Sequence, residues 1–257
     1  MDSTVHKRCL NCDHPIADEA FCPACGQRTK LPRITFKETF ADFLSSSFSL
    51  EGPFWRTMVL LFRNPGRLFR DYLSGKRKRY YKPVAFFIVN TAIYLLLGSI
   101  IGYDPLAHTN IQLTYDDVPT LVNQTAQAAR FMVGYINHIL LFLVLAIGLM
   151  CKLFFRKRYR LAEYIAVGFY IVAFYLAMGN FTVLASHYVL FALKYVNFLI
   201  LITYITVMLP SFFEDKRPAV YFKSFLVACF SLFLYMVLAF GGCLGIVLLR
   251  GVKQSVL

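Results

Sequence analysis

The stretch PVAFFIVNTAIYLLLGSII, residues 83–101, carries no charged side chain and decides the fold. Its length is close to the roughly 20 apolar residues with which an α-helix crosses the hydrocarbon core of a bilayer. Comparable apolar stretches follow it along the chain. The sequence therefore predicts an all-α integral membrane protein with about five transmembrane helices, at about 83–101, 131–155, 161–184, 188–209 and 224–249. The turn near Ser186 and His187 is short, which leaves a merged or re-entrant hairpin as an alternative for the third and fourth spans.

The composition excludes an ordinary soluble domain. Hydrophobic residues make up 58% of the chain and charged residues 16%, against roughly 45–50% and about 25% in soluble domains. The net charge of +13 is typical of a membrane protein with basic loops near anionic lipid. The N-terminus is polar and lacks the apolar segment of a cleavable signal peptide.

The placement of Lys and Arg predicts the orientation. Basic residues cluster before the first span at 76–82, after the second at 156–160 and after the fourth at 216–223, whereas 102–129 contains neither Lys nor Arg. Short loops rich in Lys and Arg stay on the cytoplasmic side. We therefore expect a cytoplasmic N-terminus and a C-terminus outside. The basic residues near the C-terminus count weakly against this, and an even number of spans would bring the C-terminus inside.

Two C-x2-C pairs precede the apolar stretches: Cys9 with Cys12, and Cys22 with Cys25. Each pair can form a tight knuckle, and two knuckles complete the tetrahedron of sulfur ligands that zinc has in closed structural sites. Gly26, directly after the last cysteine, is expected at positive φ. The cytoplasm is reducing and keeps such thiols available to a metal. The spacing therefore predicts a structural Zn²⁺ in a zinc ribbon, and iron, which uses the same ligands, is the alternative.

Amphipathic helices are expected between this ribbon and the first span. A capping box at 35–38 begins the first helix, Pro53 starts the second, and Asn64 caps the third. Aromatic residues on one face and arginines on the other are typical of helices in the headgroup plane. The alternative is a solvated arginine face on helices that pack against the membrane body. Contact with anionic lipid headgroups is predicted for Arg56, Arg63, Arg67, Arg70, Lys76, Arg77, Lys78, Arg79 and Lys82.

The chain thus divides into three parts. We expect a cytoplasmic zinc ribbon over 1–30, amphipathic interfacial helices with a basic juxtamembrane segment over 31–82, and a transmembrane helical domain over 83–257.

Polar side chains within the predicted spans are candidate functional residues. Asn137 and His138 in the second span form the candidate intramembrane polar site, with an interhelical hydrogen bond as the alternative. Glycine pairs at 98/102 and 241/245 allow close helix contact and a homo-oligomer.

Short motifs ahead of and at the first span occur in a fixed order: Cys-x-Asn-Cys at 9–12, Phe-Cys-Pro-x-Cys-Gly-Gln at 21–27, Arg-Thr at 56–57, Asn-Pro at 64–65, Tyr-Leu-x-Gly-Lys-Arg at 72–77 and Tyr-Lys-Pro at 81–83. Over about residues 9–100 the chain resembles a bacterial family of N-terminal zinc-ribbon, multi-pass membrane proteins built on a domain of unknown function. The resemblance implies a place in the cell (inner) membrane and this architecture, and it implies no activity.

A closed metal site without catalytic motifs favours a membrane scaffold or regulatory protein whose ribbon docks a cytosolic protein partner. The chain has no nucleophile elbow, phosphate loop or H-E-x-x-H motif, so we do not expect an enzyme. Basic and acidic residues nearly balance in the ribbon, which argues against nucleic acid as the partner. The alternative function is a transporter or channel component for an unidentified solute, motivated by Asn137 and His138.

Overall fold

The computed structural model describes residues 7–17, 19–31, 34, 52–102, 120–135, 139–188 and 196–255. The helix expected to begin at the capping box 35–38 lies outside the described residues, and so do Asn137 and His138.

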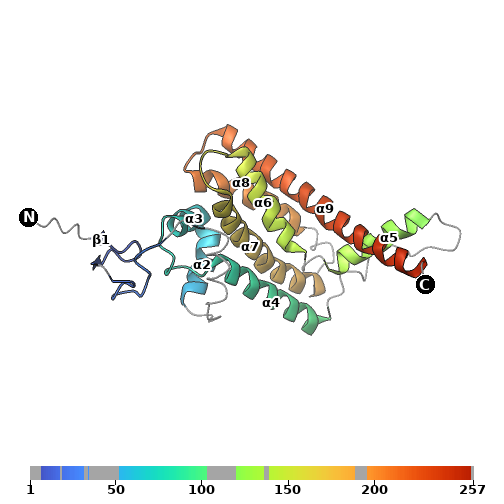
Figure 1. Ribbon diagram of the computed structural model, residues 1–257, viewed down its shortest axis with the longest axis horizontal. Coiled ribbons are helices and arrows are strands. Elements are labelled where there is room, and N and C mark those ends of the chain that lie inside the picture. The colour runs from blue at the N-terminus through green and yellow to red at the C-terminus, as the bar shows by residue number, and fades with distance from the viewer. Residues whose placement is uncertain are drawn as a thin grey trace, which may run out of the picture.

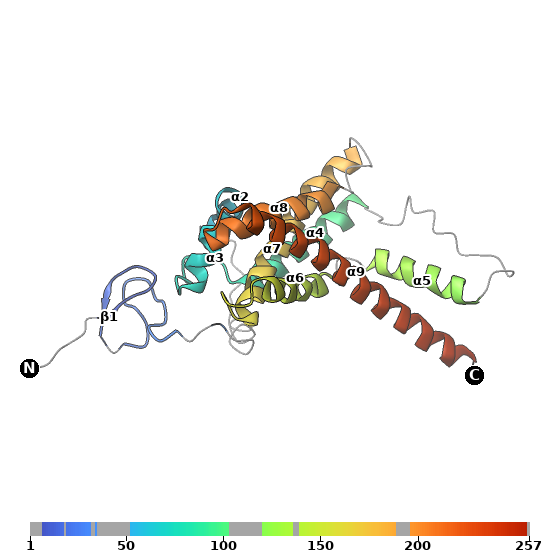
Figure 2. The same cartoon turned by 90° about the horizontal axis from the view of Figure 1, so that it is seen from above.

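A small hairpin lies at one end of the molecule, apart from a bundle of long helices (Figure 1). Strand β1 (Lys7–Arg8) pairs antiparallel with β2 (Pro15–Ile16), with Lys7 opposite Ile16. Helices α2 (Gly52–Arg63) and α3 (Pro65–Leu73) lie between this hairpin and the bundle in both views (Figures 1 and 2).

Helix α7 is the centre of the bundle and packs against α4, α6 and α8. Of its apolar stretch, 72% is buried, against 17% for the corresponding stretches of α4 and α9. The bundle consists of α4 (Pro83–Ile101), α5 (Thr120–Gly134), α6 (Leu140–Phe154), α7 (Leu161–Tyr188), α8 (Val196–Phe213) and α9 (Pro218–Ser255).

The outer helices turn large apolar side chains away from the protein. Leu96 and Ile100 on α4 are 63% and 79% exposed, and Phe233 on α9 is 68% exposed. A water-soluble protein rarely exposes apolar surface that is this continuous, whereas lipid solvates it well. The prediction of an all-α membrane protein is confirmed.

In the part of the chain that the structure describes, four helices are long and apolar enough to cross a membrane: α4, α7, α8 and α9. The structure differs from expectation at 131–155, which is divided between α5 and α6. Helix α6 has 15 residues, fewer than the roughly 20 of a full crossing. The side-chain amides of α5 and the guanidinium of Arg130 would be costly to bury in hydrocarbon. Helix α5 instead packs alongside α9 (Figure 2). Helix α9, with 38 residues, is about 57 Å long and exceeds the predicted 224–249.

Helices α2 and α3 pack on the bundle. Phe54 of α2 and Phe69 of α3 are at most 3% exposed, and the Phe69 ring lies 5.9 Å from the ring of Tyr170 in α7. The Asn64 side chain accepts a hydrogen bond from the Arg67 amide at 3.1 Å and caps α3 as predicted. This packing agrees with the alternative interpretation of these helices.

Backbone contact between α3 and α8 depends on Gly66. A Cβ atom at this position would lie 2.5 Å from the carbonyl carbon of Ser211. Because backbone cannot move away as a flexible side chain can, only glycine fits here without a shift of one helix.

We predict that Gly66→Ala lowers the free energy of unfolding by about 1–3 kcal/mol, because the added methyl group overpacks the α3–α8 contact. Thermal unfolding in detergent, followed by circular dichroism, measures the change. Gly98→Ala is the control: a Cβ there meets nothing within 4 Å, and alanine favours the helix. Equal stability of Gly66→Ala and the wild-type protein would contradict the described packing.

Candidate metal centre and its link to the membrane domain

The two cysteine knuckles have the same backbone geometry. The Cys9 amide donates a hydrogen bond to the His14 carbonyl, and the Cys9 carbonyl accepts one from the Asp13 amide, both at 2.9 Å. In the second knuckle, the Cys22 amide donates to Gln27 and its carbonyl accepts from Gly26, both at 2.8 Å. Each knuckle therefore closes with the same pair of backbone hydrogen bonds.

The residue after the second cysteine of each knuckle has a left-handed backbone conformation. Gly26 has a φ of 67°, which confirms the prediction, and Asp13 has a φ of 60° at the equivalent position. Aspartate tolerates this conformation better than most residues. The equivalence of Asp13 and Gly26 was not predicted.

The four cysteine sulfurs form one compact cluster. Cys9 Sγ lies 3.6 Å from Cys25 Sγ, Cys12 Sγ lies 3.6 Å from Cys22 Sγ, and all four sulfurs are within 4.8 Å of one another. These distances are too long for disulfides, whose S–S bond is about 2.05 Å. A tetrahedral ion with metal–sulfur bonds of about 2.3 Å has sulfur–sulfur edges of about 3.8 Å. The cluster therefore fits a metal ion held by four thiolates.

The ribbon has little other stabilisation. Its buried hydrophobic cluster consists of Cys9, Ile16 and Cys22, with Cys25 packed against it. A core of this size cannot offset the conformational entropy of about 20 ordered residues. Metal binding is therefore expected to supply most of the folding free energy of this part.

Gln27, two residues after the last cysteine, fixes the ribbon to the segment before the first span. Its amide nitrogen donates to the Gly75 carbonyl at 2.9 Å. Its amide oxygen accepts from the backbone of Arg77 at 3.1 Å and of Lys78 at 3.0 Å. The side chain is only 4% exposed, so these three bonds are shielded from water and each is costly to lose.

A close contact supports the same junction. A Cβ atom on Gly75 would lie 2.8 Å from Cδ1 of Leu10 in the first knuckle, and Gly75 has a φ of 109°. Glycine is therefore favoured for its backbone conformation, whereas the exposed end of the Leu10 side chain could move aside for a larger residue.

Asp71 stabilises the basic segment to which Gln27 is hydrogen-bonded. Its carboxylate accepts from the Tyr80 hydroxyl at 2.7 Å and from Lys76 Nζ at 3.0 Å, and lies 3.8 Å from Arg67 Nε. Burial raises the pKa of Asp71, but the bonds from Tyr80 and Lys76 outweigh it and hold the pKa below its usual value. Burial and Asp71 together raise the pKa of Tyr80 to about 12. At neutral pH the pair is therefore a carboxylate and a neutral hydroxyl donor.

Tyr81 connects this segment to the bundle. Its amide donates to Thr57 Oγ1 of α2 at 2.9 Å, and its carbonyl accepts from the Tyr170 hydroxyl of α7. Pro83 then starts α4. A continuous series of contacts thus runs from the second knuckle through Gln27 to the first membrane helix.

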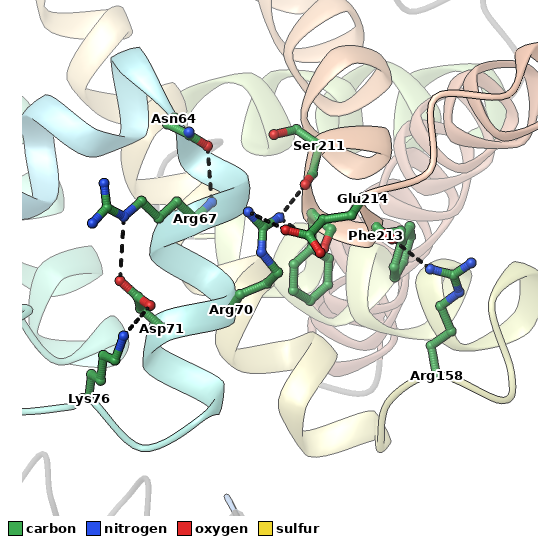
Figure 3. A network of polar contacts seen from close by, with 10 residues as sticks. Asn64, Arg67, Arg70, Asp71, Lys76, Arg158, Ser211, Phe213 and Glu214 are labelled. Carbon is green, nitrogen blue, oxygen red and sulfur yellow. Dashed lines mark hydrogen bonds and ion pairs between the residues drawn. The ribbon is translucent and has the colours of Figure 1, made fainter. Parts of the chain in front are cut away.

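Two arginines hold the C-terminal end of α8 at this same side of the bundle (Figure 3). Arg70 of α3 donates to the carbonyls of Ser211 and Phe212 and pairs with Glu214 at 3.1 Å. Arg158 donates to the Phe213 carbonyl at 2.8 Å. Cations at a helix C-terminus complement its unpaired carbonyls and its dipole.

The predicted lipid-contacting residues have different surroundings. Arg56, Arg63, Arg67 and Lys78 are exposed, whereas Arg70 is engaged with α8. Lipid contact for the whole set stays a prediction. The half-buried members are Arg70, Lys76, Arg77, Arg79 and Lys82.

Sequence reasoning missed the roles of Gln27, Asp71 and Arg158. Gln27 follows the last cysteine by two residues, and a polar residue so close to a metal site in the sequence is a signal that could have drawn attention to it. Asp71 and Arg158 carry no comparable local signal, because their partners follow from tertiary packing.

The fold and the sulfur cluster define the class of the molecule as an all-α membrane protein with an N-terminal four-cysteine cluster that could hold a metal ion. Residues 51–95 match the family model described as "Protein of unknown function (DUF3667)". This match confirms the resemblance to a family of unknown function, and it covers α2, α3, the basic segment and most of α4. Comparisons with curated proteins and with solved structures gave no match.

We predict that Gln27→Ala frees the basic segment without loss of the metal, because Gln27 is not a ligand. Trypsin should cleave after residues 76–79 roughly tenfold faster, as expected when buried hydrogen bonds of about 1–3 kcal/mol are removed. Metal content should stay at the wild-type level.

His14→Ala is the matched control, since His14 is exposed on the ribbon and contributes only its backbone carbonyl to the first knuckle. Gln27→Glu keeps the acceptor oxygen and should give an intermediate rate. Unchanged cleavage in Gln27→Ala, or equal acceleration in His14→Ala, would contradict the described junction.

Proposed function

We propose that this protein is a non-enzymatic scaffold or regulatory protein of the cell (inner) membrane, whose cytoplasmic zinc ribbon docks a cytosolic protein partner. The observation that carries the proposal is the set of hydrogen bonds from Gln27 to the backbone of residues 75–78. Through these bonds, the ribbon is attached to the segment that leads into the membrane domain. A ribbon attached in this way can couple the binding of a partner to the conformation of the membrane helices.

The gathering of basic segments supports the cytoplasmic orientation. The contact of Arg70 with Glu214 and that of Arg158 with Asp215 join three regions: α3, the segment after α6 and the segment after α8. Residues 76–82 lie at the same end, through the bonds of Asp71. Loops with this excess of Lys and Arg remain in the cytoplasm, and we assign the ribbon to that side with them.

Zinc is the ion that the donor set favours. Four thiolates close the coordination sphere, which is typical of structural rather than catalytic zinc. Iron binds the same four-sulfur arrangement, and the two ions are distinguished by measurement.

We predict about one zinc ion per chain in protein purified in detergent under reducing conditions, measured by inductively coupled plasma mass spectrometry. Cys22→Ser should lose most of this zinc, because it removes a buried ligand. Cys229→Ser should keep it, since Cys229 lies in α9 away from the cluster. Iron in place of zinc, with its visible thiolate absorption, would contradict the assignment, as would full zinc content in Cys22→Ser.

The ribbon presents an exposed aromatic side chain for a partner. Phe21 precedes the second knuckle and is 55% exposed, although aromatic residues favour burial. It faces Arg28 across an isolated antiparallel bridge. Exposed aromatic residues beside arginine are typical of the centres of protein interfaces, so Phe21 is the residue that we expect to contact the partner.

A photo-crosslinking amino acid in place of Phe21, used in intact cells, should capture one cytosolic protein reproducibly. Combining it with Cys22→Ser should abolish this adduct, because the knuckle no longer forms. The same probe in place of Arg56, an exposed residue of α2, should not give it. An adduct that is unchanged by Cys22→Ser, or no adduct at Phe21, would count against partner docking.

The transporter alternative draws on polar residues of the bundle. Asn197 of α8 donates to Thr182 of α7 at 2.7 Å, which is the kind of interhelical hydrogen bond expected from such residues. Asn90 of α4 donates to Phe86 of its own helix at 2.8 Å. These bonds give packing roles to Asn197 and Asn90, so we favour the scaffold function.

A further inference from the structure

A basic pocket lies at the end of the bundle that carries the basic segments. It has a volume of about 330 Å³ and is formed by the end of α6, the segment that follows it and the start of α9. Five cationic side chains and a single carboxylate line it: Arg156, Lys157, Arg158, Arg217, Lys223 and Asp215.

The carboxylate is already committed to two of the cations. Asp215 Oδ2 lies 2.7 Å from an Arg217 nitrogen and 3.2 Å from an Arg158 nitrogen. The hydrogen bonds from Arg217 lower the pKa of Asp215 to about 2, so it is ionised at any physiological pH. One negative charge therefore balances at most one of the two arginines.

The other three cations have no acidic partner within ion-pair distance among the described residues. Arg156, Lys157 and Lys223 are all exposed, and the described ion pairs do not involve them. The pocket as a whole thus carries an excess of four positive charges over its single carboxylate. Such a site attracts an anion from solution or from the membrane surface.

Arg158 is held in place before any ligand arrives. Its guanidinium donates to the Phe213 carbonyl at 2.8 Å, as Figure 3 shows, and lies 5.0 Å from the centre of the Phe213 ring. A fixed guanidinium loses little conformational entropy when it binds a phosphate oxygen.

The remaining wall of the pocket is apolar and continues onto the lipid-facing surface. Leu153 lines the pocket and is 53% exposed. On α9, Phe230 is 47% exposed, and its ring lies 6.0 Å from the ring of the lining residue Phe154. Cations thus lie at the polar end of α6 and α9, and apolar side chains lie beside them. A free anion needs only the first feature, whereas a lipid needs both.

We propose that this pocket binds the phosphate headgroup of an anionic phospholipid, with the acyl chains along Leu153 and Phe230. Basic pockets between helices on the cytoplasmic side are suited to such headgroups, and arginine supplies directional bonds to phosphate oxygens. The site differs from the predicted basic surface at 56–82, because it is concave. It rests on the membrane location and not on partner docking.

Native mass spectrometry of the full chain in neutral detergent tests the proposal, with phosphatidylglycerol and phosphatidylcholine as probes. The wild-type protein should retain phosphatidylglycerol in preference to phosphatidylcholine. Each cation near a membrane surface contributes roughly a fivefold change in affinity. The double variant Lys157→Gln/Lys223→Gln should therefore bind phosphatidylglycerol about 25-fold more weakly, and each single variant about fivefold.

The double variant Arg8→Gln/Lys30→Gln removes the same charge from exposed positions of the ribbon, outside both the pocket and the predicted basic surface, and should change the affinity by less than about twofold. Equal losses in the two double variants would overturn the proposal in favour of net charge. Equal retention of phosphatidylcholine by the wild-type protein would also overturn it. Displacement of phosphatidylglycerol by millimolar inorganic phosphate at constant ionic strength would assign the pocket to a soluble phosphate instead. All four substituted side chains are exposed, and thermal unfolding verifies that each variant is folded.

Discussion

The hydrogen bonds of one buried side chain, Gln27, join the two halves of this protein. On one side of Gln27 is a ribbon that has almost no hydrophobic core. On the other side are the Gly75 carbonyl and the amides of Arg77 and Lys78, in the basic segment before the first membrane helix. We propose that a metal ion at the four-cysteine cluster orders the second knuckle and so positions Gln27, and that Gln27 in turn orders the chain as it approaches the first membrane helix.

The bilayer imposes the second constraint. Within an apolar helix the backbone groups form hydrogen bonds with one another. The N–H and C=O groups at the two ends have no such partner within the helix. At the proposed cytoplasmic end, Arg70 and Arg158 satisfy the last carbonyls of α8, and Asp71, Asp215 and Glu214 balance part of the positive charge. Among the described residues, the pocket cations Arg156, Lys157 and Lys223 have no acidic partner within ion-pair distance. This excess of positive charge supports the proposed orientation and the proposed site for anionic lipid.

Local patterns predicted the fold class and the four-cysteine cluster, because both depend on residues close together in sequence. The four cysteines lie within 9–25, and apolar length alone identifies the long helices. Gly26 was predicted for the same reason. The pattern could not identify contacts across long separations. Arg70 shares a helical spacing with Arg63 and Arg67, yet its partners are 141 and 142 residues away. Hydropathy also merged the end of α5 with α6, since an average over many residues cannot locate the end of α5 at Gly134 or the start of α6 at Leu140.

Hydrogen exchange of the full chain in nanodiscs, with and without a chelator that removes the metal, tests most directly whether the metal organises the start of the membrane domain. The account predicts that metal removal accelerates exchange in two places together: residues 9–27 of the ribbon and the amides of Arg77 and Lys78, which donate to Gln27. Exchange in the buried helix α7 should not change. Loss of protection in the ribbon alone, with residues 77–78 as protected as before, would contradict the claim.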